Sequence, residues 1–113
     1  MTQKQAAPAN EVHLVGRVSG EPVVRELPSG DELVSIRVVV PRAPRKVEKR
    51  TQVDTIDVAC WTARTRAGAL RLTDGSGVQV EGALRRRFFR TGAGAVSRYE
   101  VEASALRSVD LTE

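Results

Sequence analysis

Hydrophobic and polar residues alternate with a period of two over much of the chain, which indicates half-buried β-strands. The alternating segments are residues 11–18, 33–40, 51–61, 77–89 and 98–106. Gly16 interrupts the apolar positions of the first segment, which predicts either a bulge or the close approach of another backbone segment. The side chains expected to point into the core are Val12, Leu14, Val18, Val34, Ile36, Val38, Val40, Ile56, Val58, Cys60, Val78, Val80, Gly82, Leu84, Phe88, Tyr99, Val101 and Ala103.

Turn residues and one helical segment separate these strands. A turn at 28–31 follows a short extended piece at 23–27, and Pro41 ends the next strand. Residues 62–72 contain good helix formers after a polar start, so we expect one short helix with its N-cap near Thr62. Further turns are predicted at residues 74–77 and 91–95.

The order of these elements favours one fold. Three strands, a short helix and a hairpin of two strands form the order of the oligonucleotide-binding (OB) fold, an all-β, five-stranded Greek-key barrel with one short helix between strands 3 and 4. Short antiparallel strands at this spacing can also form another small barrel, and the position of the helix favours the OB fold. We expect a flexible N-terminal arm at residues 1–10, the OB-fold domain at 11–109 and a short C-terminal end at 110–113.

Composition fits a single, weakly basic globular domain. The 113 residues are 41% hydrophobic and 28% charged, which allows one core but not a second. The net charge of +4 mildly favours an anionic partner. Arginine supplies 15 of the 18 positive charges, a bias that a GC-rich genome can produce by itself. The positions of the arginines are therefore more informative than their number.

Residues 42–50 form a basic stretch with few apolar residues between two predicted strands. It contains five cations and only one glutamate, which predicts an exposed, mobile hairpin loop that contacts phosphates rather than bases. Charge runs are also common in ordinary solvated loops, so both interpretations stay open. The cations of this loop are Arg42, Arg45, Lys46, Lys49 and Arg50.

Residues suited to catalysis or metal binding are scarce. Cys60 and His13 are the only cysteine and histidine, which excludes an internal disulfide framework and a multi-thiolate metal site. We expect Cys60 to be a small core side chain and His13 a surface one, and we expect no enzymatic activity, cofactor or metal. Two pairs of carboxylates could meet in space, although acidic residues at solvent-facing strand positions usually form a solvated face. The pairs are Asp54 with Asp57 and Glu100 with Glu102.

Neither a membrane span nor a secretory signal is apparent. No apolar run approaches the roughly 20 residues that cross a bilayer, and residues 1–10 are polar and rich in alanine. We therefore expect no membrane association and a cytoplasmic, nucleoid-associated location.

Several segments carry a recognisable order of motifs. Residues 10–18 fit N-x-V-x-L-x-G-x-[LV], and residues 77–87 are similar to the strand pattern G-x-x-V-x-V-E-G-x-L-x-x-R. In order and spacing together, these motifs resemble the bacterial single-stranded DNA-binding proteins (SSB), from about residue 10 to 109. The shorter matching pieces are residues 21–25 (D-P-E-x-R in the family), 28–30 (an N-G turn) and 98–101 (a shortened R-Y-x-x-E-V).

The resemblance implies an OB-fold homo-oligomer, a dimer or a tetramer, that binds single-stranded DNA with little sequence preference in replication, recombination or repair. The chain departs from the family pattern in two ways. Residues 109–113 end it without the family's long glycine-rich, acidic tail, which puts recruitment of repair proteins by such a tail in doubt. Pro44 and Thr55 stand where the family often has tryptophan, so we expect weaker base stacking.

One predicted outer face combines a ring with cations. Phe89 shares strand parity with two arginines, although it could instead pack against a neighbouring subunit or loop. Trp61 is either a stacking platform or a partly buried rim residue, and Arg37 extends the basic track towards the loop. The predicted nucleic-acid-binding residues are Arg37, Arg42, Arg45, Lys46, Lys49, Arg50, Trp61, Arg85, Arg87 and Phe89.

Other functions of an OB fold are compatible with these residues. A protein–protein assembly module would use the same outer face, and the aromatic content of 4% keeps this alternative open. RNA binding cannot be separated from DNA binding by sequence. A nuclease is the least favoured alternative, because no metal-ligand cluster stands out.

Overall fold

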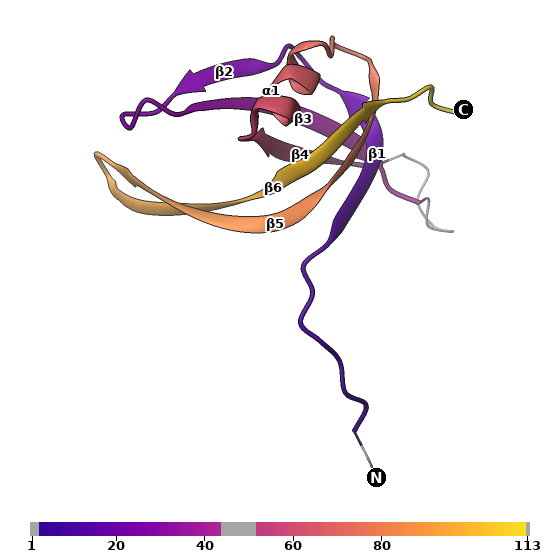
Figure 1. The fold of residues 1–113 in the computed structure, drawn as a ribbon, viewed down its shortest axis with the longest axis horizontal. Helices are drawn as coiled ribbons and strands as arrows, with labels where there is room; N and C mark the ends of the chain where they lie inside the picture. The colour runs from indigo at the N-terminus through magenta and orange to yellow at the C-terminus, as the bar shows by residue number, and fades with distance from the viewer. Residues whose placement is uncertain (1–2, 44–51, 113) are drawn as a thin grey trace.

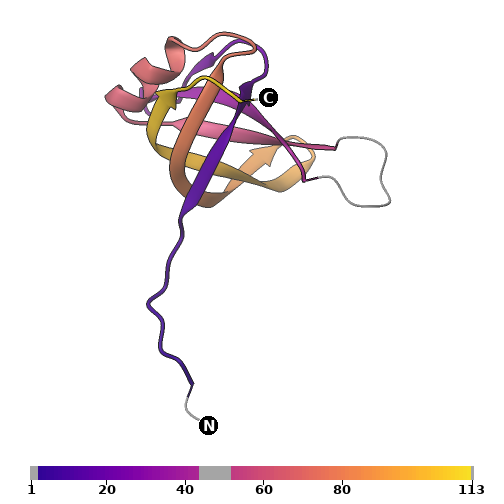
Figure 2. The same cartoon turned by 90° about the vertical axis from the view of Figure 1, so that its right-hand side faces the viewer.

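A computed structural model of the chain describes residues 3–43 and 52–112. Strands β1, β5, β6, β4 and β3 follow one another in the sheet, and pairing of β1 with β3 closes it into a barrel (Figures 1 and 2). The short strand β2 pairs with β3 outside this ring. The predicted five-stranded OB fold is thus confirmed. The elements are β1 (Val12–Val18), β2 (Val23–Glu26), β3 (Glu32–Pro41), β4 (Val53–Cys60), α1 (Ala63–Leu70), β5 (Gly77–Thr91) and β6 (Gly94–Ser108).

Valine side chains dominate the core of the barrel. Branched chains of this size suit the inward face of a strand, where a stiff rotamer packs against its neighbours at little further entropic cost. Cys60 is fully buried among them as a small apolar side chain, as predicted, and burial raises the pKa of its thiol to about 12. The fully buried residues with the largest side chains are Val18, Val34, Val38, Val58, Val78, Val80 and Cys60.

The helix lies between β4 and β5, as the sequence predicts. Thr62 caps it: its hydroxyl accepts the Thr65 N–H at 3.1 Å, and the Thr65 hydroxyl accepts the Thr62 N–H at 3.2 Å. Ala69 and Leu72 pack into the core cluster, so this segment covers part of the barrel interior. In the described part of the chain, no helix is long and apolar enough to cross a membrane.

The hairpin of β5 and β6 is longer than predicted. Each strand has 15 residues, so the pair continues past the closed barrel as a curved ribbon that ends in a tight turn (Figure 1). Phe88 and Tyr99 were expected in the core, but they lie on this ribbon and are 71% and 60% exposed. Leu84, also expected inside, is exposed as well. The side chains of Phe88 and Tyr99 project from the inward-facing side of the strands, but at this distance along the hairpin the barrel no longer lies beneath them.

Gly16 allows two backbones to approach closely, one of the two alternatives that its position predicts. A Cβ atom built on Gly16 would lie 2.3 Å from the carbonyl oxygen of Val39 and 3.0 Å from a methyl group of Val38. The closing contact between β1 and β3, where Arg17 pairs with Val39, therefore depends on a residue without a side chain.

Replacing this glycine should loosen the barrel closure. We expect Gly16→Ala to lower the free energy of unfolding by about 1–3 kcal/mol, because the backbone of β3 must shift to admit the methyl group. Urea unfolding at a fixed protein concentration measures this loss. Gly92→Ala is the matched control, since a Cβ at Gly92 would meet nothing within 4 Å. Equal midpoints for the two variants would contradict the steric argument.

Candidate nucleic-acid interface

The outer face of the barrel bears a hollow that is lined by residues from β2, β3 and the far part of the β5–β6 hairpin. Two of the predicted site residues, Arg37 and Phe89, lie in this hollow although they are far apart in sequence. Its lining residues are Ser19, Gly20, Glu21, Val23, Arg25, Ser35, Ile36, Arg37, Asp57, Phe89, Arg98 and Glu100.

Strand register fixes the position of Arg37. It lies directly opposite Asp57 on β4, and the two side chains form an ion pair with 3.6 Å between Nε and Oδ1. The two side chains are 60% and 42% exposed, so water and salt weaken this attraction. A phosphate can therefore compete with Asp57 for the Arg37 guanidinium at low cost.

Phe89 supplies an accessible ring at the far edge of the hollow. Phe89 is 41% exposed, and the guanidinium carbon of Arg98 lies 5.7 Å from the centroid of its ring. Arg98 comes from the neighbouring strand, where it lies opposite Arg87. A ring with a cation beside it is the pairing that single-strand binders use to stack a base and hold its phosphate.

Arg87 shares the strand parity of Phe89, as predicted, but its charge is already paired. Its guanidinium lies 4.6 Å from the centroid of the Trp61 ring, forms an ion pair with Glu100 and contacts Glu102 with 3.3 Å between Nη2 and Oε1. Only 29% of the Arg87 side chain and 10% of the Glu100 side chain are exposed. The expectation of a solvated carboxylate at Glu100 is therefore wrong, because Arg87 covers it.

Trp61 is half-buried at the end of β4, with Arg87 over its ring. This position is the partly buried one of the two alternatives that the sequence left open, and stacking of a base on Trp61 stays a prediction. Arg85 lies one strand repeat from Arg87, is half exposed and contacts Glu102 at 3.4 Å. Arg85 is thus the more accessible of the two arginines.

Arg42 lies beyond the end of β3, five residues along the chain from Arg37 and on the order of 16 Å away in extended backbone. Its guanidinium donates to Asp54 at 2.7 and 2.9 Å, and this hydrogen bond lowers the pKa of the Asp54 carboxyl. Arg42 also donates to Gln52 across the base of the loop. The other four predicted loop cations, Arg45, Lys46, Lys49 and Arg50, lie outside the described residues.

Known proteins share the sequence pattern and the fold of this chain. Residues 9–109, nearly the whole chain, match the single-strand binding protein family. The chain belongs to this family. It is 28% identical over 102 residues to single-stranded DNA-binding protein B of Bacillus subtilis (strain 168), an alignment that covers 89% of this chain and 90% of that protein.

A solved structure of the SSB fold also superimposes on the chain. The Plasmodium falciparum SSB in complex with single-stranded DNA matches with a TM-score of 0.78 and 22% identity, covering 95% of this chain and all of that one. At this level of identity the match establishes the fold of the barrel.

Two arginines of the hollow were missed by sequence reasoning about this SSB-family chain. Arg25 lies on β2, whose four residues are too few to display an alternating pattern. Arg98 could have been found from the sequence, because it occupies an outward-facing position on a strand that forms a hairpin with the strand of Phe89. Pairing the two predicted strands residue by residue would have placed it beside that ring.

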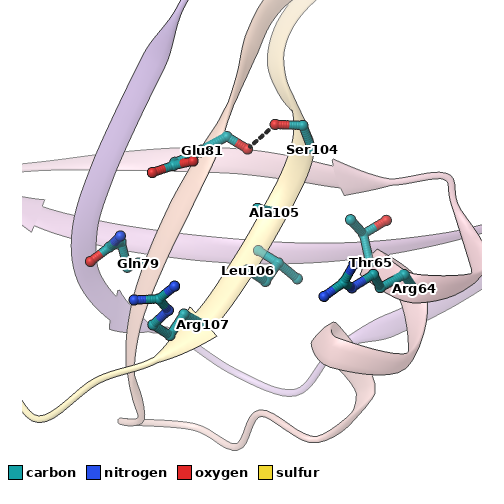
Figure 3. A pocket seen from close by; sticks show the side chains of 8 residues that line it. All are labelled: Arg64, Thr65, Gln79, Glu81, Ser104, Ala105, Leu106 and Arg107. Carbon is teal, nitrogen blue, oxygen red and sulfur yellow. Dashed lines mark hydrogen bonds between the residues drawn. The ribbon is translucent and has the colours of Figure 1, made fainter.

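A second hollow lies beside the helix and contains none of the predicted site residues (Figure 3). Figure 3 shows the side chains of Arg64 and Thr65 on α1 across from those on the adjoining strands, where the Ser104 hydroxyl donates to the Glu81 carbonyl oxygen at 3.1 Å. It offers no exposed ring. Among residues 3–43 and 52–112, no group of three or more His, Cys, Asp or Glu could hold a metal ion.

The pairing of Arg87 leads to a prediction about stability. Arg87→Ala would leave Glu100 buried without its cation, so we expect the free energy of unfolding to fall by about 3 kcal/mol. Arg85→Ala, the control on the same face, removes a more exposed pair and should cost about 0–1 kcal/mol. Urea unfolding of both variants tests this, and a loss for Arg87→Ala no larger than for Arg85→Ala would contradict a structural role.

Proposed function

We propose that this chain binds single-stranded DNA with little sequence preference, across the hollow between β2, β3 and the β5–β6 hairpin. The observation that carries the proposal is the meeting of an exposed Phe89 ring with Arg37 and Arg98 in one hollow. Membership of the single-strand binding protein family supports the same conclusion, as do the relatives whose names describe single-stranded DNA binding.

The exposed rings supply binding that does not depend on base identity. Every base has a flat face, so stacking on an aromatic ring contributes about 1–3 kcal/mol for any of them. Phe89 is the accessible platform, and the half-buried Trp61, over whose ring Arg87 lies, is the predicted second one. We assign Arg87 a positioning role, holding Trp61 and tying β5 to β6, because its charge is paired with carboxylates.

Phosphates are held by the accessible arginines. Arg25, Arg37, Arg85 and Arg98 lie on or beside the hollow and donate through planar guanidinium groups that fit phosphate oxygens. Residues 42–50 would extend this track with Arg42, Arg45, Lys46, Lys49 and Arg50. Such contacts carry no sequence information and depend on salt.

The cellular role follows from this chemistry. A protein that coats single strands without reading their sequence acts wherever duplex DNA is opened, in replication, recombination and repair. We place it with the chromosomal DNA in the cytoplasm, because its substrate arises there. RNA binding is tested by competition between oligo-dT and oligo-rU of equal length.

We also propose that the protein is a homo-oligomer. Among the described residues, the part of β1 before Arg17 pairs with β5 along one edge only, which leaves its other edge open for pairing. The exposed Val15 side chain on this strand lines an apolar groove with Val39, Val109 and Leu111. An open strand edge beside an apolar groove is suited to a second copy of the chain.

A salt series tests the proposed DNA binding. Labelled oligo-dT should bind at low salt, and log K should fall linearly with log salt by roughly 0.7 per neutralised phosphate. Phe89→Ala should weaken binding by about 1–3 kcal/mol without changing the slope, because it removes stacking alone. Arg37→Gln should reduce the slope by about 0.7, and Arg45→Ala with Lys46→Ala by about twice that.

Leu70→Ala is the matched control for the loss of an exposed apolar side chain, since Leu70 is on the helix and outside the hollow. It should bind oligo-dT like the unchanged protein. Absence of binding at low salt would overturn the proposed function. A Phe89→Ala variant that binds normally would remove Phe89 from the site.

Light scattering after size exclusion tests the oligomer. We expect a mass that is a multiple of 12.3 kDa, and a shift towards the monomer for Val15→Glu, which places a charge in the apolar groove. Val24→Glu, at an exposed position on β2, should leave the mass unchanged. A strictly monomeric protein at micromolar concentration would contradict the proposal.

A further inference from the structure

The β5–β6 hairpin has a second aromatic surface on the face opposite Phe89. Arg86 and Tyr99 are directly opposite each other in the ladder, and Phe88 follows one strand repeat after Arg86 on the same face. The guanidinium carbon of Arg86 lies 5.0 Å from the centroid of the Phe88 ring and 5.5 Å from that of Tyr99. Both rings are more exposed than Phe89. One cation is therefore bracketed by two accessible rings.

The charge on this face differs from that on the face of the hollow. There, Arg85 and Arg87 contact Glu100 and Glu102. On the opposite face, strand parity places two arginines, Arg86 and Arg90, and no acidic residue between residues 84 and 101 of the hairpin. Arg86 instead donates to the Ser97 hydroxyl at 3.2 Å. Its charge has no carboxylate partner among the described residues.

We propose that Arg86, Phe88 and Tyr99 form a second binding site for single-stranded nucleic acid, on which one or two bases stack while Arg86 holds the adjoining phosphate. This site rests on the proposed function and extends it to the other face of the hairpin. Exposed rings around an unopposed cation suit a planar, anionic ligand. A second copy of this face would bring arginine against arginine, which opposes self-association here.

The two sites lie back to back on one strand. Phe88 and Phe89 are consecutive residues, so their Cα atoms are about 3.8 Å apart and their side chains project to opposite faces. The hairpin ends a few residues further on, in the turn between Thr91 and Gly94 (Figure 1). A nucleic acid strand that leaves the hollow at Phe89 can pass around this free end and reach Phe88. Only a nucleic acid that is longer than the segment bound in the hollow can reach Phe88 in this way.

The test compares short and long oligonucleotides, because only the long one can occupy both sites. OB folds cover about 4–16 nucleotides, so oligo-dT of about 8 and about 30 nucleotides separates the two cases. Phe88→Ala with Tyr99→Ala should weaken binding of the long oligonucleotide by about 10-fold or more and that of the short one by less than about 2-fold. The control variant, Phe88→Tyr with Tyr99→Phe, keeps both rings and should bind both oligonucleotides normally.

A second measurement reports contact with the site directly. In a Trp61→Phe background, Phe88→Trp places the sole tryptophan on this face, and its fluorescence should be quenched by the long oligo-dT but not by the short one. Unchanged long-oligonucleotide affinity for the alanine variant, or no quenching, would overturn the site. So would an alanine variant that loses only self-association, which would make this face a contact between copies. Failure of the unchanged protein to bind either oligonucleotide would overturn the proposed function itself.

Discussion

The antiparallel pairing of β5 with β6 is the constraint on which the rest of the structure depends. Within the barrel it aligns Val78, Val80, Val101 and Ala103 towards the core, and beyond the barrel it continues as a free ribbon. The register shifts once, between Glu81 and Gly82, where a Cβ on Gly82 would lie 2.1 Å from the Glu102 carbonyl oxygen. The hairpin can therefore bend at the barrel wall, and the register of all pairs after Gly82 stays constant.

This pairing also sorts the charges of the hairpin. Because directly opposed residues share a face, Arg85 faces Glu100 whereas Arg86 faces Tyr99. One face therefore receives Glu100 and Glu102 together with Phe89, and the other receives Phe88 and Tyr99. Three arginines in a row, Arg85 to Arg87, are consequently placed in two different electrostatic environments. Total charge and a run of arginines in the sequence carry no trace of this difference.

Period-two patterning predicted most of the fold correctly, because it reflects which face of a strand is buried. It placed Val34, Ile36 and Val38 in the core, and the polar start at Thr62 located the helix cap. It failed at Phe88 and Tyr99, since alternation gives the direction of a side chain but not the length over which a barrel lies beneath it. That length depends on closure between β1 and β3, which is a contact between distant segments.

The site was predictable only in part, for a related reason. Parity correctly grouped Arg85, Arg87 and Phe89 on one face, and Phe89 and Arg37 lie in one hollow. The cluster of Arg87, Glu100 and Trp61 was not visible, because Trp61 follows β4 and reaches the β5–β6 hairpin only in the folded barrel. Accessible and structural arginines look identical in a sequence. They differ in which carboxylates the register brings to them.

The balance of charge in the hollow determines what its arginines can do. Three arginines line it (Arg25, Arg37 and Arg98) together with three acids (Glu21, Asp57 and Glu100), so the net side-chain charge of the lining is 3 − 3 = 0. A phosphate can displace Asp57 from Arg37, since an exposed ion pair contributes only about 0–1 kcal/mol. It cannot displace Glu100 from Arg87 without leaving a buried carboxylate unpaired. Affinity in the hollow therefore combines stacking on Phe89 with phosphate contacts from arginines such as Arg37, whose ion pair is easily displaced, and does not depend on the net charge of the lining.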